Sequence, residues 1–391
     1  MTTRIFRGTN YTVESLRGSD QTFKTKQKNT WLEIIGTNNI ISTGKGNDVI
    51  LANLRFTGIG NYPPYVGPAI FYDGYDGILE SSKRGTTIID TGSGNDYVAL
   101  GEGKYIVDLG QGNNILDSGG TSSYISAGNG NNIIQVLTVD NCQINLGNGN
   151  NSIYLGTGNV SVSTGSGNDL ITINIDGLFG ILGDVLFDEA VPYKQIINAG
   201  NGDNLLKVAV YGETSITTGS GKDFVLATSA NTQILDKEPN LDSVDILTGS
   251  GNDTVITLGT KSFINAGTGD DLIFSGIGDD TIYTGSGRDV VNLRRQTFFA
   301  PSPIQDLEEI YASETTVQGG GNDTVYLGSG HKTVILGSSG FATIYGFGKN
   351  DSLDVSGLNA SFTQIGNDTL ISSGGNSLGI IKEYTGSLTL V

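Results

Sequence analysis

The amino-acid sequence predicts an all-β solenoid in which short strands alternate with glycine turns. Three observations support this prediction. Gly accounts for 59 of the 391 residues, without the three-residue period of collagen and with only 7 Pro. A turn motif returns every nine residues over much of the chain. An aliphatic side chain follows each turn at a fixed distance, as expected when stacked units share one core.

The turn motif is Thr-Gly-Ser-Gly-Asn-Asp in its clearest copies. These lie at 91–96, 164–169 and 248–253, and a copy with Arg lies at 284–289. Gly supplies the positive φ angles of tight turns, and a β-branched residue two positions after the acid, such as Val255, would face inward from a short strand. Because one unit cannot bury its aliphatic residue alone, neighbouring units must stack.

Charge and composition exclude several classes of protein. Lys and Arg number 22 against 40 Asp and Glu, and the net charge of −18 disfavours nucleic acid and anionic membranes and favours a cationic partner. One Cys and one His argue against a disulfide framework, Cys-based zinc sites and most catalytic triads. We therefore expect no enzyme. No apolar run approaches a transmembrane length, and the first residues lack the apolar core of a cleaved signal peptide.

The repeats resemble the glycine-rich nonapeptide repeats of RTX (hemolysin-type calcium-binding) proteins, over roughly residues 40–358. The leading Gly of that family is replaced here by Thr, Leu, Ala or Ser. The resemblance implies a calcium-loaded parallel β-roll in which two nonapeptides form one coil. On this basis we expect a parallel β-roll, or β-solenoid, of about thirteen 18-residue coils.

Assigning the repeats alternately to two edges predicts one regular edge and one edge with insertions. The regular edge would contain Gly44, Gly92, Gly110, Gly128, Gly147, Gly165, Gly200, Gly219, Gly249, Gly267, Gly285, Gly319 and Gly337. Most spacings are 18 or 19. The longer spacings indicate insertions at about 54–84, 176–192, 236–242 and 294–314, all leaving from the opposite edge.

The ends of the chain are expected to protect the stack. Residues 1–40 are predicted to form an N-terminal cap, 41–345 the roll with its insertions, and 346–391 a C-terminal cap. The last residues, Ser387-Leu-Thr-Leu-Val391, are similar to uncleaved C-terminal signals for type I secretion. The expected location is extracellular or on the cell surface.

In the family that the chain resembles, calcium lies between successive turns and is bound by backbone carbonyls and the turn Asp. The resemblance implies these ligands: Asp253, Asp270, Asp271, Asp279, Asp280, Asp289, Asp323, Asp96 and Asp169, with Asp48 and Asp223 as further matches. Elsewhere the position is Asn114, Asn132, Asn151 or Asn204, and amide ladders there could stack without a cation. Turns capped without any metal are the alternative for the acidic stretch.

The expected function is a secreted calcium-binding structural or adhesion module that folds on calcium. One alternative is a carbohydrate-binding or polysaccharide-acting protein that uses the aromatic insertion residues Tyr62, Tyr65, Tyr72 and Tyr75. Another is a self-assembling surface-layer or filament subunit joined through the apolar segment 177–187.

Overall fold

The computed structural model describes residues 2–6, 9–26, 29–36, 38–53, 85–101, 103–119, 122–137, 139–156, 158–173, 192–229, 242–294, 296–299, 314–317 and 320–391. The chain divides into two compact units, Met1–Ser166 (unit 1) and Gly167–Val391 (unit 2). Each named element in the described ranges is a β-strand. No helix among these residues is long and apolar enough to cross a membrane.

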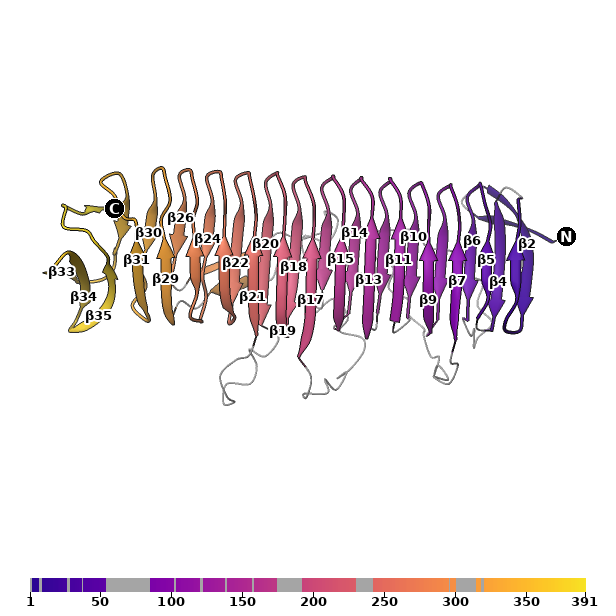
Figure 1. The fold of residues 1–391 in the computed structure, drawn as a ribbon, viewed down its shortest axis with the longest axis horizontal. Coiled ribbons are helices and arrows are strands. Elements are labelled where there is room, and N and C mark those ends of the chain that lie inside the picture. Colours follow the sequence, from indigo (N-terminus) through magenta and orange to yellow (C-terminus); the bar gives the residue numbers. More distant parts are fainter. Residues whose placement is uncertain are drawn as a thin grey trace. The chain divides into compact units, whose positions relative to one another are not determined.

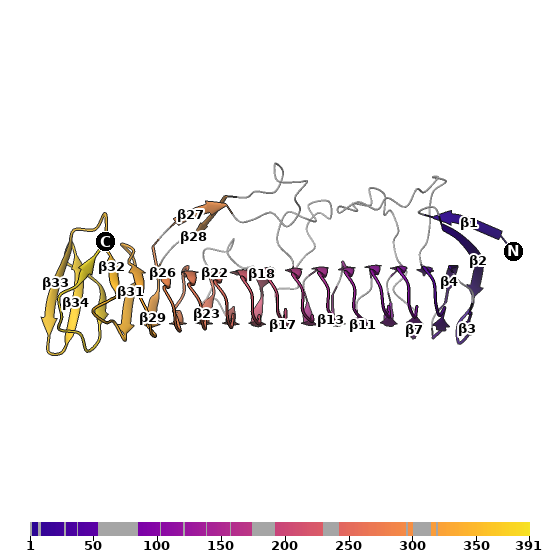
Figure 2. The same ribbon diagram turned by 90° about the horizontal axis from the view of Figure 1, so that it is seen from above.

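Unit 1 consists of two parallel sheets that face each other (Figures 1 and 2). Sheet A contains β2 (Thr9–Arg17), β4 (Thr30–Ile35), β6 (Val49–Ala52), β8 (Tyr97–Leu100), β10 (Ile115–Ser118), β12 (Ile133–Val136) and β14 (Ser152–Leu155). Sheet B contains β3 (Thr22–Lys24), β5 (Ile40–Ser42), β7 (Thr86–Asp90), β9 (Lys104–Asp108), β11 (Ser122–Ala127), β13 (Asn141–Leu146) and β15 (Asn159–Ser163). β1 (Thr2–Phe6) pairs antiparallel with β2 and covers its edge.

Unit 2 repeats this arrangement. Its sheet A contains β16 (Leu170–Ile173), β18 (Leu205–Val210), β20 (Phe224–Ser229), β22 (Thr254–Leu258), β24 (Leu272–Phe274), β26 (Val290–Asn292), β30 (Thr333–Ile335), β32 (Ser352–Asp354) and β36 (Thr389–Leu390). Its sheet B contains β17 (Tyr193–Asn198), β19 (Gly212–Thr217), β21 (Ser243–Leu247), β23 (Lys261–Asn265), β25 (Thr281–Tyr283), β29 (Asn322–Tyr326) and β31 (Phe341–Tyr345).

The C-terminal end of unit 2 changes from parallel to antiparallel pairing. β35 (Asn376–Ile381) pairs with β31, and β34 (Asp368–Ser373) and β33 (Ala360–Ile365) follow as antiparallel strands. A separate antiparallel pair joins β27 (Gln296–Phe299) to β28 (Glu314–Val317). The antiparallel strands β33–β35 lie within the segment predicted as the C-terminal cap.

The core of each unit lies between its two sheets. In unit 1, Ile134 and Ile153 are completely buried, and in unit 2 Val225 and Ile273 are too. These are the aliphatic residues that follow the glycine turns in the sequence. Their repetition confirms the predicted all-β parallel roll with a shared aliphatic core.

The turns require glycine because successive coils approach closely at this point. Gly251 has φ 134°, a left-handed conformation that other residues rarely adopt. A Cβ atom at this position would lie 1.6 Å from the carbonyl oxygen of Gly221 in the preceding coil. A side chain at Gly251 would therefore separate the coils.

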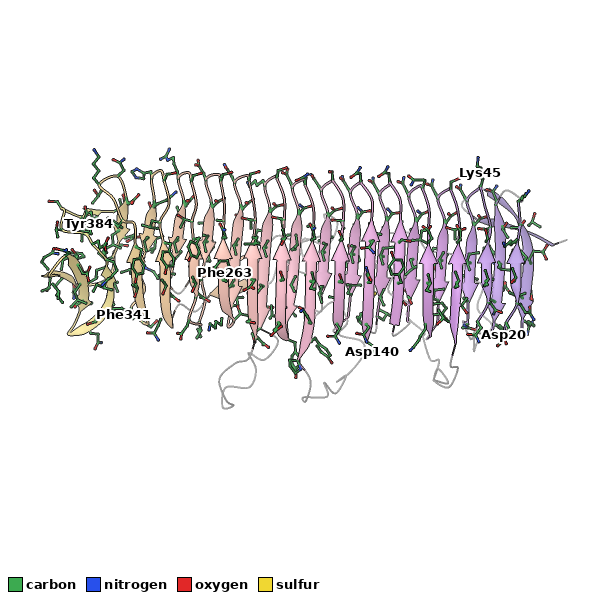
Figure 3. The ribbon with its side chains drawn as sticks, in the orientation of Figure 1. Asp20, Lys45, Asp140, Phe263, Phe341 and Tyr384 are labelled. Carbon is green, nitrogen blue, oxygen red and sulfur yellow. The ribbon has the colours of Figure 1, made fainter. Side chains whose placement is uncertain are left out.

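The insertions leave from one edge, as predicted. They connect β6 to β7, β16 to β17, β20 to β21 and β26 to β29, so each leaves sheet A and returns to sheet B. Most insertion residues, including Tyr62, Tyr65, Tyr72 and Tyr75, lie outside the described residues. The opposite, regular edge contains short turns, such as the one at Lys45 (Figure 3).

The predicted edge assignment is wrong near the end of the roll. A Cβ at Gly321, which follows Gly319, would lie 1.7 Å from the oxygen of Gly278, and the nearest atom to a Cβ at Gly337 is the oxygen of Leu293. Both turns therefore belong to the edge with insertions, and Gly328 continues the regular edge above Gly285. The reason is the length of the last insertion, because the coil contacts here span 43 residues rather than 18.

Candidate metal centre

The regular edge positions one buried side chain per coil, at the sixth residue of each turn and, in the last turn, at the seventh. We call these residues the Asx column. In unit 1 they are Asp48, Asp96, Asn114, Asn132 and Asn151, and in unit 2 they are Asp169, Asn204, Asp223, Asp253, Asp271, Asp289, Lys332 and Asp351. The strands of sheet A begin directly after these residues, so the parallel register aligns them.

The Asp residues of the column are joined by hydrogen bonds in which the backbone N–H of one coil donates to the Asp carboxylate of the next coil. The Asp223 N–H donates to Asp253 Oδ1 at 2.9 Å, and the Asp253 N–H donates to Asp271 Oδ1 at 2.9 Å. The Asp271 N–H donates to Asp289 Oδ1 at 3.0 Å. In unit 1 the Asp48 N–H donates to Asp96 Oδ1 at 2.7 Å. One oxygen of each accepting carboxylate is thereby satisfied by the neighbouring backbone.

The Asn residues of the column also satisfy their second side-chain atom. Asn132 Nδ2 donates to Gly130 O and to Asn151 Oδ1, both at 3.0 Å. In unit 2, Asn204 Nδ2 lies 3.0 Å from Gly202 O and 2.9 Å from Asp223 Oδ1, with a longer contact of 3.4 Å to Gly200 O. The turn carbonyl oxygens are therefore directed at the column side chain.

The Asp turns leave a buried oxygen without a hydrogen bond. Within the described part of the chain, Oδ2 has no hydrogen-bond partner in Asp48, Asp96, Asp223, Asp253 and Asp271. Burial raises the pKa of Asp96 and of Asp271 to about 7 and that of Asp253 to about 6. A buried carboxylate with one unpaired oxygen destabilises the folded state unless a cation or a proton compensates its charge.

These turns offer the ligand type that calcium prefers, which is six to eight oxygen atoms. Among the described residues no three His, Cys, Asp or Glu side chains gather in a way that could hold a metal. Each Asp turn supplies one buried column carboxylate, so turn carbonyls must complete any calcium shell. Asp48 and Asp96 in unit 1, and Asp223, Asp253 and Asp271 in unit 2, fit this requirement through their orphaned Oδ2 atoms.

The acids predicted as calcium ligands in unit 2 lie on both edges. Asp253, Asp271 and Asp289 belong to the Asx column, whereas Asp280 and Asp323 form a pair on the edge with insertions. Asp280 Oδ1 accepts the Ser262 N–H at 2.7 Å, and its Oδ2 accepts the Ser275 hydroxyl. Asp280 is therefore hydrogen-bonded through both oxygens.

Of the two acids in this pair, Asp323 has the larger pKa shift. Its Oδ1 accepts the Asp280 N–H at 3.3 Å. Burial, followed by the negative charge of Asp280, raises the Asp323 pKa to about 8.

The remaining predicted ligands divide between the Asx column and the surface. Asp96 is buried in unit 1, and Asp169 is buried in unit 2, where its N–H donates to Asn204 Oδ1 at 3.0 Å. Asp270 and Asp279 are exposed, and each accepts a backbone N–H from the next coil.

Sequence reasoning missed Lys332, which occupies the column position of its turn. The signal was present, because Gly328-Ser-Gly-His-Lys332 aligns Lys with the sixth residue of the motif. Its side chain is fully buried and contacts Asp289, at 2.6 Å between Nζ and Oδ2.

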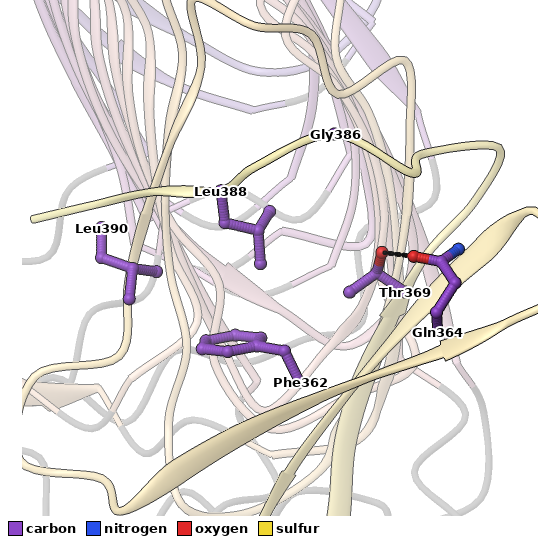
Figure 4. A pocket seen from close by; sticks show the side chains of 6 residues that line it. All are labelled: Phe362, Gln364, Thr369, Gly386, Leu388 and Leu390. Atoms are coloured by element: carbon purple, nitrogen blue, oxygen red, sulfur yellow. Dashed lines mark hydrogen bonds between the residues drawn. The ribbon is translucent and has the colours of Figure 1, made fainter.

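Two further surface features lie in unit 2. On the outer face of sheet B, Tyr283, Tyr326 and Tyr345 stack face to face, with ring centroids 4.5 and 5.0 Å apart. Phe263, labelled in Figure 3, lies next to Tyr283 in this row. Because the rings cover one another's faces, the stack presents ring edges rather than a flat binding platform. An open pocket of about 320 Å³ at the C-terminal end is lined by Phe362, Leu388 and Leu390 (Figure 4). Thr369, which donates a hydrogen bond to Gln364, also lines it.

The fold and the column together define a parallel β-roll module whose glycine turns present oxygen ligands. The RTX calcium-binding nonapeptide repeat family matches the chain in four copies, at residues 36–54, 146–172, 262–291 and 319–331. No curated protein matches the chain significantly. The chain therefore carries RTX calcium-binding repeats, in which Ca²⁺ is a structural ion. The last match ends one residue before Lys332.

Proposed function

We propose that the chain is a secreted structural or adhesion module whose Asp turns close when extracellular calcium binds. The observation behind the proposal is the orphaned Oδ2 of the buried column acids, of which Asp253 and Asp271 are 1% and 2% exposed. When bound, calcium would neutralise these carboxylates. The chain contributes the stacked Asp side chains and the carbonyls of its glycine turns, which orient the ligands.

Circular dichroism in calcium and in chelator tests this function. We expect the β spectrum to weaken in chelator and to return with calcium, whereas magnesium restores it poorly because it demands a smaller octahedral shell. An unchanged β spectrum in chelator would indicate a roll that folds constitutively.

A matched pair of double variants separates ligation from net charge. Asp253→Asn with Asp271→Asn removes two buried carboxylates, and Asp270→Asn with Asp279→Asn removes two exposed ones. We expect only the first variant to bind fewer calcium ions. Equal losses in both would indicate a diffuse charge effect.

We also propose that the chain is not an enzyme. His331 is exposed on a turn, and burial raises the pKa of the Cys142 thiol to about 12, which disfavours the nucleophilic thiolate. The carbohydrate and self-assembly alternatives depend on the insertions and stay hypotheses. A glycan array comparing the wild type with a Tyr62, Tyr65, Tyr72 and Tyr75 to Ala variant tests the first, and concentration-dependent light scattering tests the second.

A further inference from the structure

Lys332 is a buried cation inside the regular edge of unit 2. It lies between β29 and β30, at the position where the preceding turns have Asp253, Asp271 and Asp289. Its side chain and that of Asp289 are both 0% exposed. A buried ammonium is tolerated only when its hydrogen bonds are complete.

The Lys332 ammonium has a complete set of acceptors. Nζ donates to Asp289 Oδ2 at 2.6 Å, to Ser329 O at 2.7 Å and to Gly287 O at 2.9 Å. An ammonium has three N–H groups, so none is left over. The acceptors are one column carboxylate and two turn carbonyls, which is the ligand type that the Asp turns offer to calcium.

Asp289 differs from its neighbours because of this contact. Oδ2 has no hydrogen-bond partner in Asp253 or Asp271, whereas Oδ2 of Asp289 accepts the Lys332 ammonium. The next coil completes the arrangement, since Asp351 accepts the Lys332 N–H at 2.9 Å and the Gly348 N–H at 2.7 Å. The Lys332 ammonium and the carboxylates of Asp289 and Asp351 thus all have hydrogen-bond partners within the chain itself.

We propose that Lys332 is a tethered substitute for a calcium ion, so that this turn closes without metal and excludes it. The inference rests on the proposed calcium-binding function of the other Asp turns. A calcium ion would need the same oxygens of Asp289, Gly287 and Ser329 and would be repelled by the ammonium. Lys222 and Arg288, two other cations on this edge of unit 2, are exposed and lie one residue before the column.

Lysine acylation of the wild-type protein tests the proposal directly. Mass spectrometry would compare Lys332 with the exposed Lys222 in calcium and in chelator. We expect Lys332 to react at least about 100-fold more slowly than Lys222 in calcium, because reaction requires the turn to open. Rapid reaction of Lys332 in calcium would show that the ion displaces it and would overturn the proposal. In chelator the neighbouring Asp turns are themselves expected to open, so the result in calcium decides.

Counting bound calcium in two variants supplies a second test. Lys332→Asp replaces the ammonium with a ligand, and we expect one more calcium ion per chain than in the wild type. Lys222→Asp makes the same charge change on an exposed turn and should leave the count unchanged. A folded Lys332→Asp protein with the wild-type count contradicts the proposal. If Lys332→Asp does not fold, the acylation result decides.

The two tests separate this inference from the proposed function. A wild-type chain that binds no calcium refutes the calcium function, even when Lys332 is protected in chelator. A chain that binds calcium but exposes Lys332 in calcium keeps the function and refutes the substitution.

Discussion

The Asn turns of unit 1 and the Asp turns of unit 2 have the same backbone and differ in one side-chain group. Gly130 and Gly251 have φ angles of 141° and 134°, and both column types accept a backbone N–H from the neighbouring coil. The Asn132 amide donates to Gly130 O and to the next Asn, whereas Oδ2 of Asp253 has no hydrogen-bond partner. The comparison predicts that metal dependence is set by the column side chain and not by the turn.

Stacking of consecutive Asp turns increases the difference in electrostatic energy between Asp and Asn columns. The pKa of Asp271 is raised first by burial and then by the negative charges of Asp289 and Asp253, and the positive charge of Lys332 lowers it. A neutral amide column has no such repulsion. Consecutive Asp turns therefore need a compensating cation or proton, while consecutive Asn turns do not.

Calcium removal should produce the largest contrast between the two kinds of turn. If two sites are each held at a calcium concentration of about 100 times Kd, chelation removes about 5 kcal/mol. Hydrogen exchange should show a large loss of protection at the Leu272 amide, which donates to Asp253 O. The loss should be less than about tenfold at Ile133, which donates to Asn114 O. Equal losses at both amides would contradict the comparison.

Glycine substitution should affect both kinds of turn alike. A Cβ at Gly130 would lie 2.0 Å from Gly112 O, and one at Gly251 would lie 1.6 Å from Gly221 O. We expect Gly130→Ala and Gly251→Ala each to cost on the order of 3 kcal/mol, from the backbone clash and the positive φ. Gly366→Ala is the control, because Gly366 has φ 62° with no atom within 4 Å of its Cβ. It should cost about 1 kcal/mol in thermal denaturation.

The sequence was sufficient to predict the periodic parts of the molecule. The nine-residue repeat predicts the parallel roll, its aliphatic core and the single edge with insertions, because glycine spacing and strand alternation are local properties. It also aligns Asp253, Asp271 and Asp289, which the structure positions in one column.

Non-periodic features could not be predicted in this way. The length of the last insertion decides on which edge of the roll Asp323 lies, and the repeat does not encode that length. The pairing of Asp323 with Asp280 is therefore evident only in the fold. Lys332 departs from the motif at its most informative position, and charge alone favours an exposed lysine. Its burial depends on three hydrogen-bond acceptors, which are the Asp289 carboxylate and the backbone carbonyls of Gly287 and Ser329.

Exchanging Asn and Asp should exchange the behaviour of the turns. Asp271→Asn restores donors for the turn carbonyls and removes a buried charge, so in chelator we expect unit 2 to gain about 2 kcal/mol. Asn132→Asp should lose a similar amount in chelator and recover with calcium, because it gives up the hydrogen bonds to Gly130 and Asn151. Urea denaturation with and without calcium measures both. A calcium-independent Asn132→Asp protein would show that the column residue does not set metal dependence.

The smallest expected effect, per pH unit, is the pH dependence of the metal-free protein. The folded-state pKa values of Asp253 and Asp271 are raised to about 6 and about 7 from an unfolded value near 3.8. The folded state therefore binds more protons than the unfolded state between about pH 4 and 7. Stability should increase as the pH falls through this window, by at most about 1.4 kcal/mol per pH unit for each carboxyl.

Calcium should reverse this dependence, since protons and the ion compete for the same carboxylates. Urea midpoints between pH 8 and 5 would show opposite slopes in metal-free and calcium buffers, and Asp271→Asn should flatten both. The Asn turns provide the internal reference, because a side-chain amide does not titrate in this range. If the protein instead loses stability on acidification without calcium, the buried carboxylates are stabilised as anions by the turn itself, and the distinction between Asn and Asp turns fails.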